Sequence, residues 1–418
     1  MKGKSKTDKA AILTAITLKN PQIINGCQTV ISIYRAYTQL SDEYKQRHLR
    51  ESCFVPVRII KTNKPDLLDE VVTASNNQNK MSSRNLRSNT RIQRTLQRKF
   101  DQLEYRWFYE RKDGEFESLK RYHTRTFKPK DYESADKHRI VSNDEIAKAW
   151  LSFIGFSSLA SEKINAFESV DDLLVAGRYE WLFEKRPNAA HWNAITLGPQ
   201  PTFTDEDFDP FSPAPEQYLL SYLILEFARA YLPSPQANKK ACEQRLILSK
   251  KIKEGSSAEE KNKAMMEDDS YVLYQILSNM KEVIVELFAW VLVKTYGPIT
   301  EVTARQLLHL PGLLDIYKNP DLKSYMNDIR QMEPKRKLTN MLFICMEFIK
   351  EGIMRWTSVN KREYLASQRR IRFLHSAATI EQMKGFLAQA NESTRLFAEE
   401  WKPPDVSFLE SLPKLKKS

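Results

Sequence analysis

The chain has 418 residues, of which 41% are hydrophobic and 28% are charged, and its formal net charge is +12 at pH 7. This length and balance predict a globular protein of about two or three domains and exclude a disordered chain. The longest apolar run, Val283 to Val293, is interrupted by Glu286 and falls short of the roughly 20 residues that a membrane helix needs. The four cysteines are scattered without a CxxC pair, so we expect reduced thiols, a cytoplasmic location and no metal site.

The positive charge is concentrated in one segment. From Arg84 to Arg139 there are 16 Lys and Arg residues against 9 Asp and Glu, which places +7 of the total within this stretch. Concentrated positive charge favours a polyanionic partner, either nucleic acid or nucleotide, over a neutral small molecule. A basic surface that serves only solubility is the open alternative.

Strand and helix patterns alternate over the first 140 residues. Apolar β-branched runs predict strands at 11–18 and 54–60. Helical spacing predicts one helix from Gln28, another after Pro65 and a long third helix from Ser82 or Ser83 to about Leu103. A short strand at 107–109 and a turn at 112–114 follow. The fold class predicted is α+β, with an α/β domain over residues 8–140.

From residue 141 to 418 the pattern is mainly α-helical and predicts a second domain. Ser142 and Glu145 form a capping-box signature for a helix that continues through Trp150. A Pro-rich, acidic segment at 198–216 predicts an exposed linker, and the charged stretch 249–269 is either a solvated helix or mobile. Further helices are predicted at 216–232, 270–296, 301–310, 336–351 and 379–398.

The first polar signature, Asn25-Gly26-Cys27-Gln28-Thr29, lies at a predicted strand-to-helix junction. Gly26 permits the positive φ of a tight turn, and unpaired N–H groups at the start of the next helix favour an anion. We therefore predict that Asn25, Gly26, Gln28 and Thr29 cradle a phosphate, with an ordinary polar-capped turn as the alternative. Cys27 has no histidine nearby, so it is expected to be a buried thiol rather than a nucleophile.

A second polar run, Ser75 to Lys80, directly precedes the third predicted helix. Asn and Gln side chains both donate and accept hydrogen bonds, which suits a base edge or a ribose. A solvated loop is the alternative. The residues predicted to bind nucleotide or nucleic acid here are Asn76, Asn77, Gln78, Asn79 and Lys80.

Five arginines recur along the third predicted helix at spacings of 3, 4, 3 and 4: Arg84, Arg87, Arg91, Arg94 and Arg98. At about 100° per residue they occupy one narrow sector, opposite an apolar face. Guanidinium groups suit phosphates, so we predict that Arg84, Arg87, Arg91 and Arg94 bind nucleotide or nucleic acid. The basic and aromatic residues 120–128 extend this surface, either as a stacking platform for single-stranded bases or as a strand with an exposed basic edge.

Glu110 and Lys112, preceded by Asp101, loosely match the layout of metal-dependent nucleases. In such enzymes carboxylates hold a divalent ion and a lysine assists. Asp101, Glu110 and Lys112 are therefore the catalytic candidates, although such triplets are frequent by chance and Asp101 is expected to end a helix.

Several of these segments together resemble the AIPR family, the abortive-infection phage-resistance proteins of bacteria. They are 20–29, 55–60, 75–80 with Asn85-Leu86, and Trp107 to Glu115. The resemblance covers roughly residues 18–150 and implies a role in phage defence without a settled reaction. Members usually carry a further N-terminal region, which leaves open that the chain is a fragment or a truncated form.

A more distant similarity is to ParB/sulfiredoxin-like domains, which implies that fold for residues 8–140. In those domains a phosphate-binding turn, an Asn-rich box and a basic helix follow one another in the order found here. The ParB motif Gly-Glu-Arg-Arg is replaced by Asn-Gly-Cys-Gln at 25–28, which argues against nucleoside triphosphate hydrolysis.

The sequence thus predicts a bacterial anti-phage defence protein that binds nucleic acid or nucleotide through an Asn/Gln pocket and an arginine-rich helix. Whether it is an enzyme stays open. One alternative is a metal-dependent nuclease or nucleoside triphosphate hydrolase, with Mg²⁺ and a nucleotide as cofactors. Another is an interaction module that senses a phage protein. Besides nucleic acid or nucleotide, the partners considered are a phage component and a second copy of the chain, and no membrane is expected.

Overall fold

The computed structural model describes residues 87–134, 137–161, 178–197, 205–232, 234–333 and 340–393, together with Val30, Ile33, Tyr34, Tyr37, Thr38 and Arg47. The chain divides into two units, Met1–Ser82 and Ser83–Ser418, and each is described by itself. In the first unit the six described residues are helical, and Thr38 Oγ1 donates to the carbonyl of Tyr34 at 3.0 Å. This confirms the helix predicted from Gln28 at Val30, Ile33, Tyr34 and Tyr37. The predicted strands 11–18 and 54–60 lie outside the described residues.

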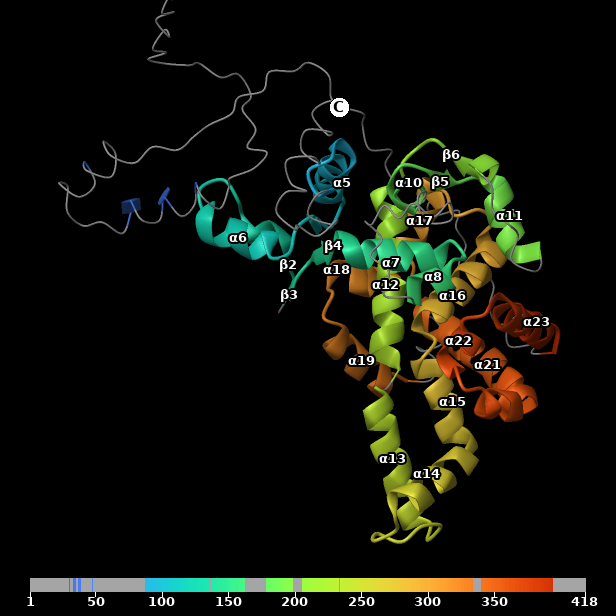
Figure 1. Ribbon diagram of the computed structural model, residues 1–418. Helices are drawn as coiled ribbons and strands as arrows, with labels where there is room; N and C mark the ends of the chain where they lie inside the picture. The colour runs from blue at the N-terminus through green and yellow to red at the C-terminus, as the bar shows by residue number, and fades with distance from the viewer. Residues whose placement is uncertain are drawn as a thin grey trace, which may run out of the picture. The chain divides into compact units, whose positions relative to one another are not determined.

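The second unit is mostly helical and carries small two-stranded sheets (Figure 1). Its first elements, with η for a 3-10 helix, are α5 (Arg91–Asp101), β1 (Phe108–Glu110), α6 (Glu115–Tyr122), η1 (Pro129–Tyr132), β2 (Glu133–Ser134), β3 (Lys137–His138), β4 (Ile140–Ser142), α7 (Asn143–Phe153), α8 (Ser157–Ser161), α10 (Arg178–Phe183), β5 (Arg186–Pro187), α11 (Ala189–Leu197), η2 (Asp205–Asp207) and β6 (Phe208–Asp209). Helices follow: α12 (Pro215–Tyr231), α13 (Pro235–Leu248), α14 (Ala258–Glu267), α15 (Asp269–Ser278), α16 (Lys281–Tyr296), α17 (Glu301–Leu308), α18 (Leu313–Lys318), α19 (Leu322–Gln331), α21 (Met341–Ala366), α22 (Arg370–Leu374) and α23 (Ala377–Ser393). An α+β class with a helical C-terminal part is confirmed.

The core of this unit is built around α16. Residues Val283 to Val293 of this helix are all buried, which is expected for a helix that is apolar on every side. It packs against α7, α8, α11, α12 and α21. The longest apolar run of the sequence is therefore the centre of the helical core.

Among the described residues, no single helix is long and apolar enough to cross a membrane. Helices α16 and α17 are long and apolar enough only when they are taken together, and the chain bends by 103° between them.

Local signals account for many helix ends. Ser142 Oγ accepts a hydrogen bond from Glu145 N at 3.2 Å, so the predicted cap of α7 is confirmed. The single helix predicted over 270–296 is wrong, because α15 ends at Ser278 and α16 begins at Lys281. At this break, Ser278 Oγ donates to Tyr274 O and Asn279 Nδ2 donates to Gln275 O, and such side chains compete for helix carbonyls.

Two other helical predictions change in extent. The charged stretch 249–269 contains α14, which Ser257 opens with a capping box to Glu260. The helix predicted over 336–351 is α21, which Asn340 caps and which continues to Ala366. The described part of the Pro-rich segment contains η2 and β6, and β6 pairs with β5. The domain boundary at residue 140 stays a prediction.

The small parallel sheet of β1 and β4 positions the segment Trp107 to Glu115. Strand β1 pairs with β4 in the register Phe108↔Ile140, Tyr109↔Val141 and Glu110↔Ser142, and α5 and α6 both pack on β1. The turn predicted after β1 is confirmed at Asp113–Gly114, where Gly114 adopts a φ of 70° and directly precedes α6. A positive φ favours glycine at this position.

Helices α21 and α23 approach each other closely at Gly352. A Cβ added there would lie 2.8 Å from Cγ of Leu387 and closer still to its Cδ2. We expect Gly352→Ala to lower the free energy of unfolding by about 1–3 kcal/mol, measured by urea denaturation, because the added methyl overpacks the contact. In a double-mutant cycle, Leu387→Ala should cost less in the Gly352→Ala background than in the wild type.

Gly385 on α23 is the matched control, because an added Cβ would meet no atom within 4 Å. Gly385→Ala should be neutral or stabilise the protein by up to about 1 kcal/mol through helix propensity. Equal effects at the two glycines would contradict the close approach of α21 and α23.

Candidate nucleic-acid interface

A buried polar network connects α5, β1 and α7 beneath the motif Trp107 to Glu115. The Tyr109 hydroxyl donates to Gln93 Oε1 at 2.7 Å, and Asn143 Nδ2 donates to the carbonyl of Arg111 at 3.1 Å. Gln93 and Asn143 have no exposed surface. Tyr179 of α10 joins through Thr90 Oγ1 at 3.0 Å, and burial raises its pKa to about 12, so it is a neutral phenol. Buried polar groups need such partners, which fixes α5 against the motif.

Arg111, whose carbonyl belongs to this network, also has its side chain held in place. Its guanidinium pairs with Glu115 Oε1 at 2.6 Å and donates to the carbonyl of Ser88 at 3.1 Å, while Glu115 Oε2 accepts from the backbone of Arg111 at 2.9 Å. Both side chains are mostly buried, at 14% and 13% exposure. Arg111 is therefore part of the scaffold and is not presented to a ligand.

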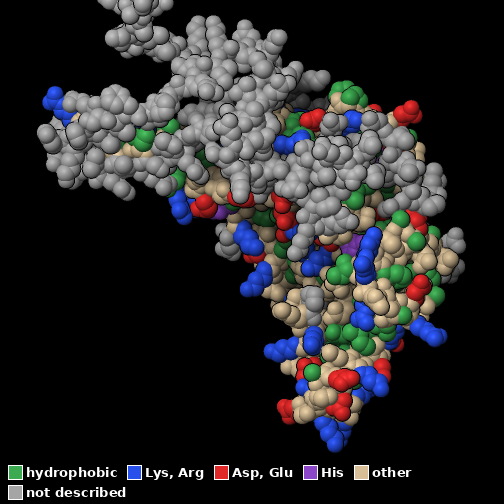
Figure 2. Space-filling view, in the orientation of Figure 1, with side chains coloured by type: hydrophobic (Ala, Val, Ile, Leu, Met, Phe, Trp, Pro, Cys, Tyr) green, Lys and Arg blue, Asp and Glu red, His purple; other side chains and the backbone are tan. Residues whose placement is uncertain are grey.

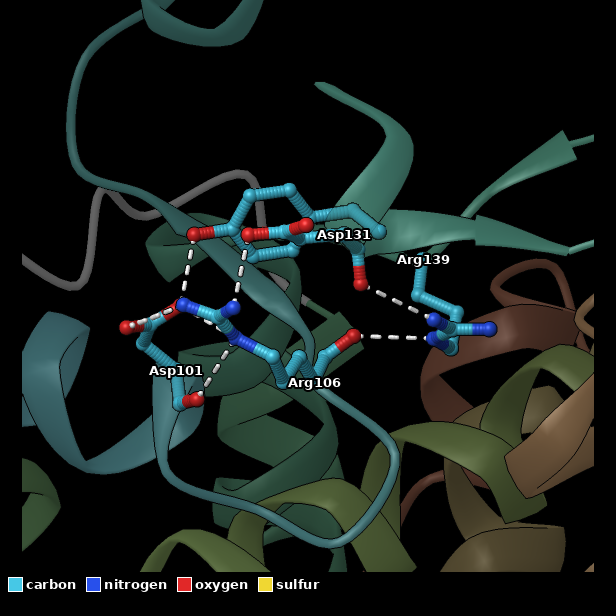
Figure 3. Close-up of polar contacts among 5 residues, drawn as sticks. Asp101, Arg106, Asp131 and Arg139 are labelled. Carbon is cyan, nitrogen blue, oxygen red and sulfur yellow. Dashed lines mark hydrogen bonds and ion pairs between the residues drawn. The ribbon is translucent and has the colours of Figure 1, made fainter. Parts of the chain in front are cut away.

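A second network surrounds Arg106 (Figure 3). Its guanidinium donates to both carboxylate oxygens of Asp101, at 2.8 and 3.0 Å, and to Asp131 Oδ2 at 2.7 Å. The Tyr132 hydroxyl donates to Asp101 Oδ1 at 2.6 Å, and burial together with this bond raises the pKa of Tyr132. Burial lowers the pKa of Arg106, but the hydrogen bond and charge of Asp101 outweigh it, so the net shift is upward. One arginine thus neutralises two of the acids in the basic segment.

Arg139 extends this network to the helical core. It donates to the carbonyls of Arg106 at 2.8 Å and Asp131 at 3.1 Å (Figure 3). It also donates to the carbonyl of Lys318 at 3.3 Å, at the end of α18. Trp107 Nε1 also donates to the carbonyl of Tyr317 at 3.3 Å. A cation and an indole N–H therefore satisfy carbonyls that the C-terminus of a helix leaves unpaired. These bonds dock residues 105–139 on α18.

A small aromatic cluster of its own underlies α6. It consists of Phe108, Phe116 and Tyr132, with Phe127 packed against them at ring distances of 5.3–5.7 Å. These rings meet edge to face or stacked, the arrangements that aromatic pairs prefer. The loop after α6 is therefore anchored from inside by Phe127.

The outer surface of this cluster is basic. We call residues 120–130 the basic tract: it contains Lys120, Arg121, Arg125, Lys128 and Lys130, and no Asp or Glu. All five cations are exposed, and within the described residues none of them forms an ion pair. The last turn of α6 includes Lys120 and Arg121, which complement the helix dipole, but this reason does not apply to the other three. The alternative of a strand with a basic edge is wrong, because the tract is a helix end followed by a loop and η1.

The predicted arginine ladder is interrupted. A turn at Ser88–Thr90, in which Thr90 N donates to Arg87 O at 3.1 Å, precedes α5, so one continuous helix to Leu103 is wrong. Thr90 has extended backbone angles and bonds Tyr179, a residue far along the chain. The Arg87 guanidinium lies 4.3 Å from the centre of the Tyr179 ring, a cation–π contact.

The rest of the ladder is on α5. Arg91 and Arg98 are exposed, as is Lys99, and Arg94 is partly buried. Arg98 contacts Thr95 Oγ1 at 3.4 Å, and among the described residues none of these four cations has an acidic partner. The structure therefore retains a basic face on α5, shorter than predicted.

The arm formed by α13 and α14 provides a contrast. Figure 2 shows Lys, Arg, Asp and Glu side chains interspersed over its lower end. From Pro235 to Asp269 the sequence has 8 Lys and Arg residues and 7 Asp and Glu residues, a net charge of +1. A balanced surface is typical of a solvated face, whereas the basic tract is unbalanced.

The remaining predicted site residues are placed as follows. Asp101 ends α5 within the Arg106 network, Glu110 Oε1 accepts from Phe116 N at 3.2 Å at the start of α6, and Lys112 lies in the turn after β1. No group of three or more His, Cys, Asp or Glu in the described part of the chain could hold a metal ion. A catalytic role for these three residues stays a prediction. The others lie outside the described residues: Asn25, Gly26, Gln28, Thr29, Asn76, Asn77, Gln78, Asn79, Lys80 and Arg84.

Sequence reasoning missed Gln93, Asn143 and Tyr179, because single polar residues at helical positions carry no motif. It also ended the tract at residue 128, although Lys130 continues the run before the acid at Asp131.

These features define a class: a mostly helical α+β protein that carries a small basic module on one edge. Residues 3–174 match the family model described as AIPR protein, so the predicted resemblance to the AIPR family is confirmed for this part of the chain. The match spans α5, the basic tract and α7. The similarity to ParB/sulfiredoxin-like domains is not confirmed. No curated protein and no solved structure matches the chain.

Proposed function

We propose that this chain acts in bacterial anti-phage defence by binding nucleic acid through the basic tract and the exposed face of α5. Membership of the AIPR family suggests the abortive-infection role. The observation that supports binding is the tract itself: five exposed cations without an acid between them, on a dedicated aromatic cluster inside the matched segment. The Asn/Gln pocket predicted from the sequence, which lies outside the described residues, belongs to the same proposal, with a nucleotide and Mg²⁺ as its alternative ligands.

The distribution of ion pairs supports this proposal. Asp101, Asp131 and Glu115, three of the acids in the segment, are bound by Arg106 and Arg111. Their negative charge is therefore compensated within the scaffold. The five cations of the basic tract are exposed and have no acidic partner among the described residues, which is the arrangement that attracts a polyanion.

Neutralising the tract tests the proposal. We expect Lys120→Gln/Arg121→Gln/Arg125→Gln to weaken binding to a single-stranded or duplex oligonucleotide about 100-fold at about 0.1 M salt, measured by fluorescence anisotropy. Each lost phosphate contact lowers the slope of log K against log salt by about 0.7–0.9, so the slope should fall by about 2–3.

Lys240→Gln/Lys251→Gln/Lys253→Gln is the matched control, because these lysines are exposed on the α13–α14 arm and no acidic partner contacts them within the described residues. It should leave the affinity and the salt slope unchanged. Equal losses in the two triple variants would mean that only the net charge matters, and a wild-type protein that binds no nucleic acid would end the proposal.

A further inference from the structure

The loop that follows α6 is fixed in place. The carbonyl of His123 accepts hydrogen bonds from Thr126 N at 3.0 Å and from Phe127 N at 2.8 Å, and Phe127 packs into the aromatic cluster. His123, Thr124, Arg125 and Thr126 are exposed around this turn. A loop whose two ends are held costs little entropy to order when a ligand binds.

Tyr122, the last residue of α6, presents a large side chain on this surface. The residue is 50% exposed, a high value for an aromatic side chain, and it is flanked in sequence by Arg121 and in the following loop by Arg125. An exposed ring among cations is the combination that single-strand binding proteins use, since bases stack on the ring while cations contact the phosphates.

The shape of the module disfavours a duplex reader. Helix α6 has eight residues and is thus about 12 Å long, and its first turn carries Glu115 and the exposed Glu117. Helices that read the major groove usually contact base edges through their N-terminal residues. In α6 this turn has no cation: it holds Glu115, which is mostly buried and paired with Arg111, and the exposed Glu117. The cations of this helix, Lys120 and Arg121, lie in its last turn, next to the irregular loop.

We propose that the basic tract binds single-stranded nucleic acid, with the Tyr122 ring as a base-stacking platform beside Lys120, Arg121 and Arg125. This inference rests on the proposed function and specifies its ligand. The chemistry is shared by single-stranded DNA and RNA, since every base has a π-face and every nucleotide a phosphate.

The test measures affinity by anisotropy for labelled oligo(dT) and oligo(rU) of about 20 nucleotides and for a DNA hairpin duplex. We expect Tyr122→Ala to weaken binding of the single strands about 5- to 150-fold, to change duplex binding less than about 2-fold and to leave the salt slope unaltered. Tyr122→Trp should retain single-strand affinity, and its additional tryptophan emission should be quenched by oligo(dT). Leu248→Ala, at an apolar residue that is 83% exposed on the α13–α14 arm, is the control and should change nothing.

The outcomes separate this inference from the proposed function. If Tyr122→Ala binds single strands like the wild type while the tract triple variant does not, stacking is overturned and nucleic-acid binding stands. Tighter binding of the wild type to the duplex than to single strands would also overturn the single-strand assignment. Absence of binding to all three probes would reject the proposed function itself. Circular dichroism and thermal melting establish that each variant is folded.

Discussion

Lys384→Met is expected to lower the free energy of unfolding by about 3–5 kcal/mol, measured by urea denaturation at pH 8. Lys384 on α23 pairs with Glu286 of α16 at 3.1 Å, and the two side chains are only 7% and 0% exposed. Glu286 Oε2 also accepts a hydrogen bond from Ser157 Oγ at 2.6 Å, so three helices converge on one carboxylate. Removing the ammonium leaves that carboxylate buried without its counter-charge, which is costly in a low-dielectric interior.

Removing the charges together identifies the cause of this loss. Lys384 also pairs with Glu381 of its own helix at 3.0 Å, so the triple variant Glu286→Gln/Glu381→Gln/Lys384→Met removes all three charges and should recover most of the stability. Lys261→Met is the matched control: Lys261 pairs with Glu243 at 2.7 Å, but at 22% and 31% exposure this pair should contribute about 1 kcal/mol or less. A triple variant that is as unstable as Lys384→Met would contradict the account.

The same ion pair illustrates what the sequence reveals and what it conceals. Glu286 is visible in the sequence as the one charge within the longest apolar run, and the structure buries this run in the helical core. Its partner Lys384 lies 98 positions further on, in a helix whose other residues give no sign of the pairing. Long-range pairs of this kind depend on how helices pack, which periodicity does not encode.

Helix boundaries were predictable where they depend on local contacts and not where they depend on residues distant in the sequence. The cap at Ser142 was predictable because it is a local hydrogen bond to a residue three positions on. The turn at Ser88–Thr90 could not be predicted from the sequence, because the hydrogen bond between Thr90 and Tyr179 spans 89 positions. Arginine spacing alone predicts a continuous ladder, and tertiary contacts override such propensities.

For the candidate interface, the sequence predicted the charge but not its availability. Arg87, Arg106 and Arg111 look like Arg91 in the printed sequence. The structure distinguishes them by their contacts. Arg87 lies over the ring of Tyr179, Arg106 pairs with Asp101 and Asp131, and Arg111 pairs with Glu115. The charge of the tract was predictable because no acid lies within residues 120–130, although Glu117 and Asp131 flank it; that its five cations have no acidic partner among the described residues is seen only in the structure. Whether an arginine or lysine is free to bind a ligand thus depends on side chains that can be distant in the sequence.

His191→Gln is expected to flatten the decline of stability with falling pH. His191 on α11 has no exposed surface, its Nε2 bonds the carbonyl of Ile154 at 3.0 Å, and its ring lies 4.9 Å from that of Phe208. Burial disfavours the charged form and lowers the pKa of His191 from 6.5 to about 4, although the bond to Ile154 and the charge of Asp207 act in the opposite direction.

The sign follows from linkage. Because the folded-state pKa lies below the unfolded value, the histidine is neutral in both states above about pH 6.5 and contributes no pH dependence there. As the pH falls from 6.5 toward 4, the unfolded chain takes up a proton that the folded chain does not. At about 1.4 kcal/mol per pH unit, the loss should reach about 2 kcal/mol at pH 5 and about 3 kcal/mol at pH 4.

Urea denaturation at intervals between pH 7.5 and 5 isolates this effect, because carboxylates with lowered pKa values titrate mainly below that range. His191→Gln keeps a donor for the Ile154 carbonyl but loses ring packing, so its stability should be lower at pH 7.5 and its slope against pH smaller. His123→Gln is the control, since His123 is exposed in the basic tract and should leave the slope of the wild type unchanged. Equal slopes for wild type and His191→Gln would show that His191 takes up its proton in the folded state, and the neutral, buried imidazole inferred here would then be wrong.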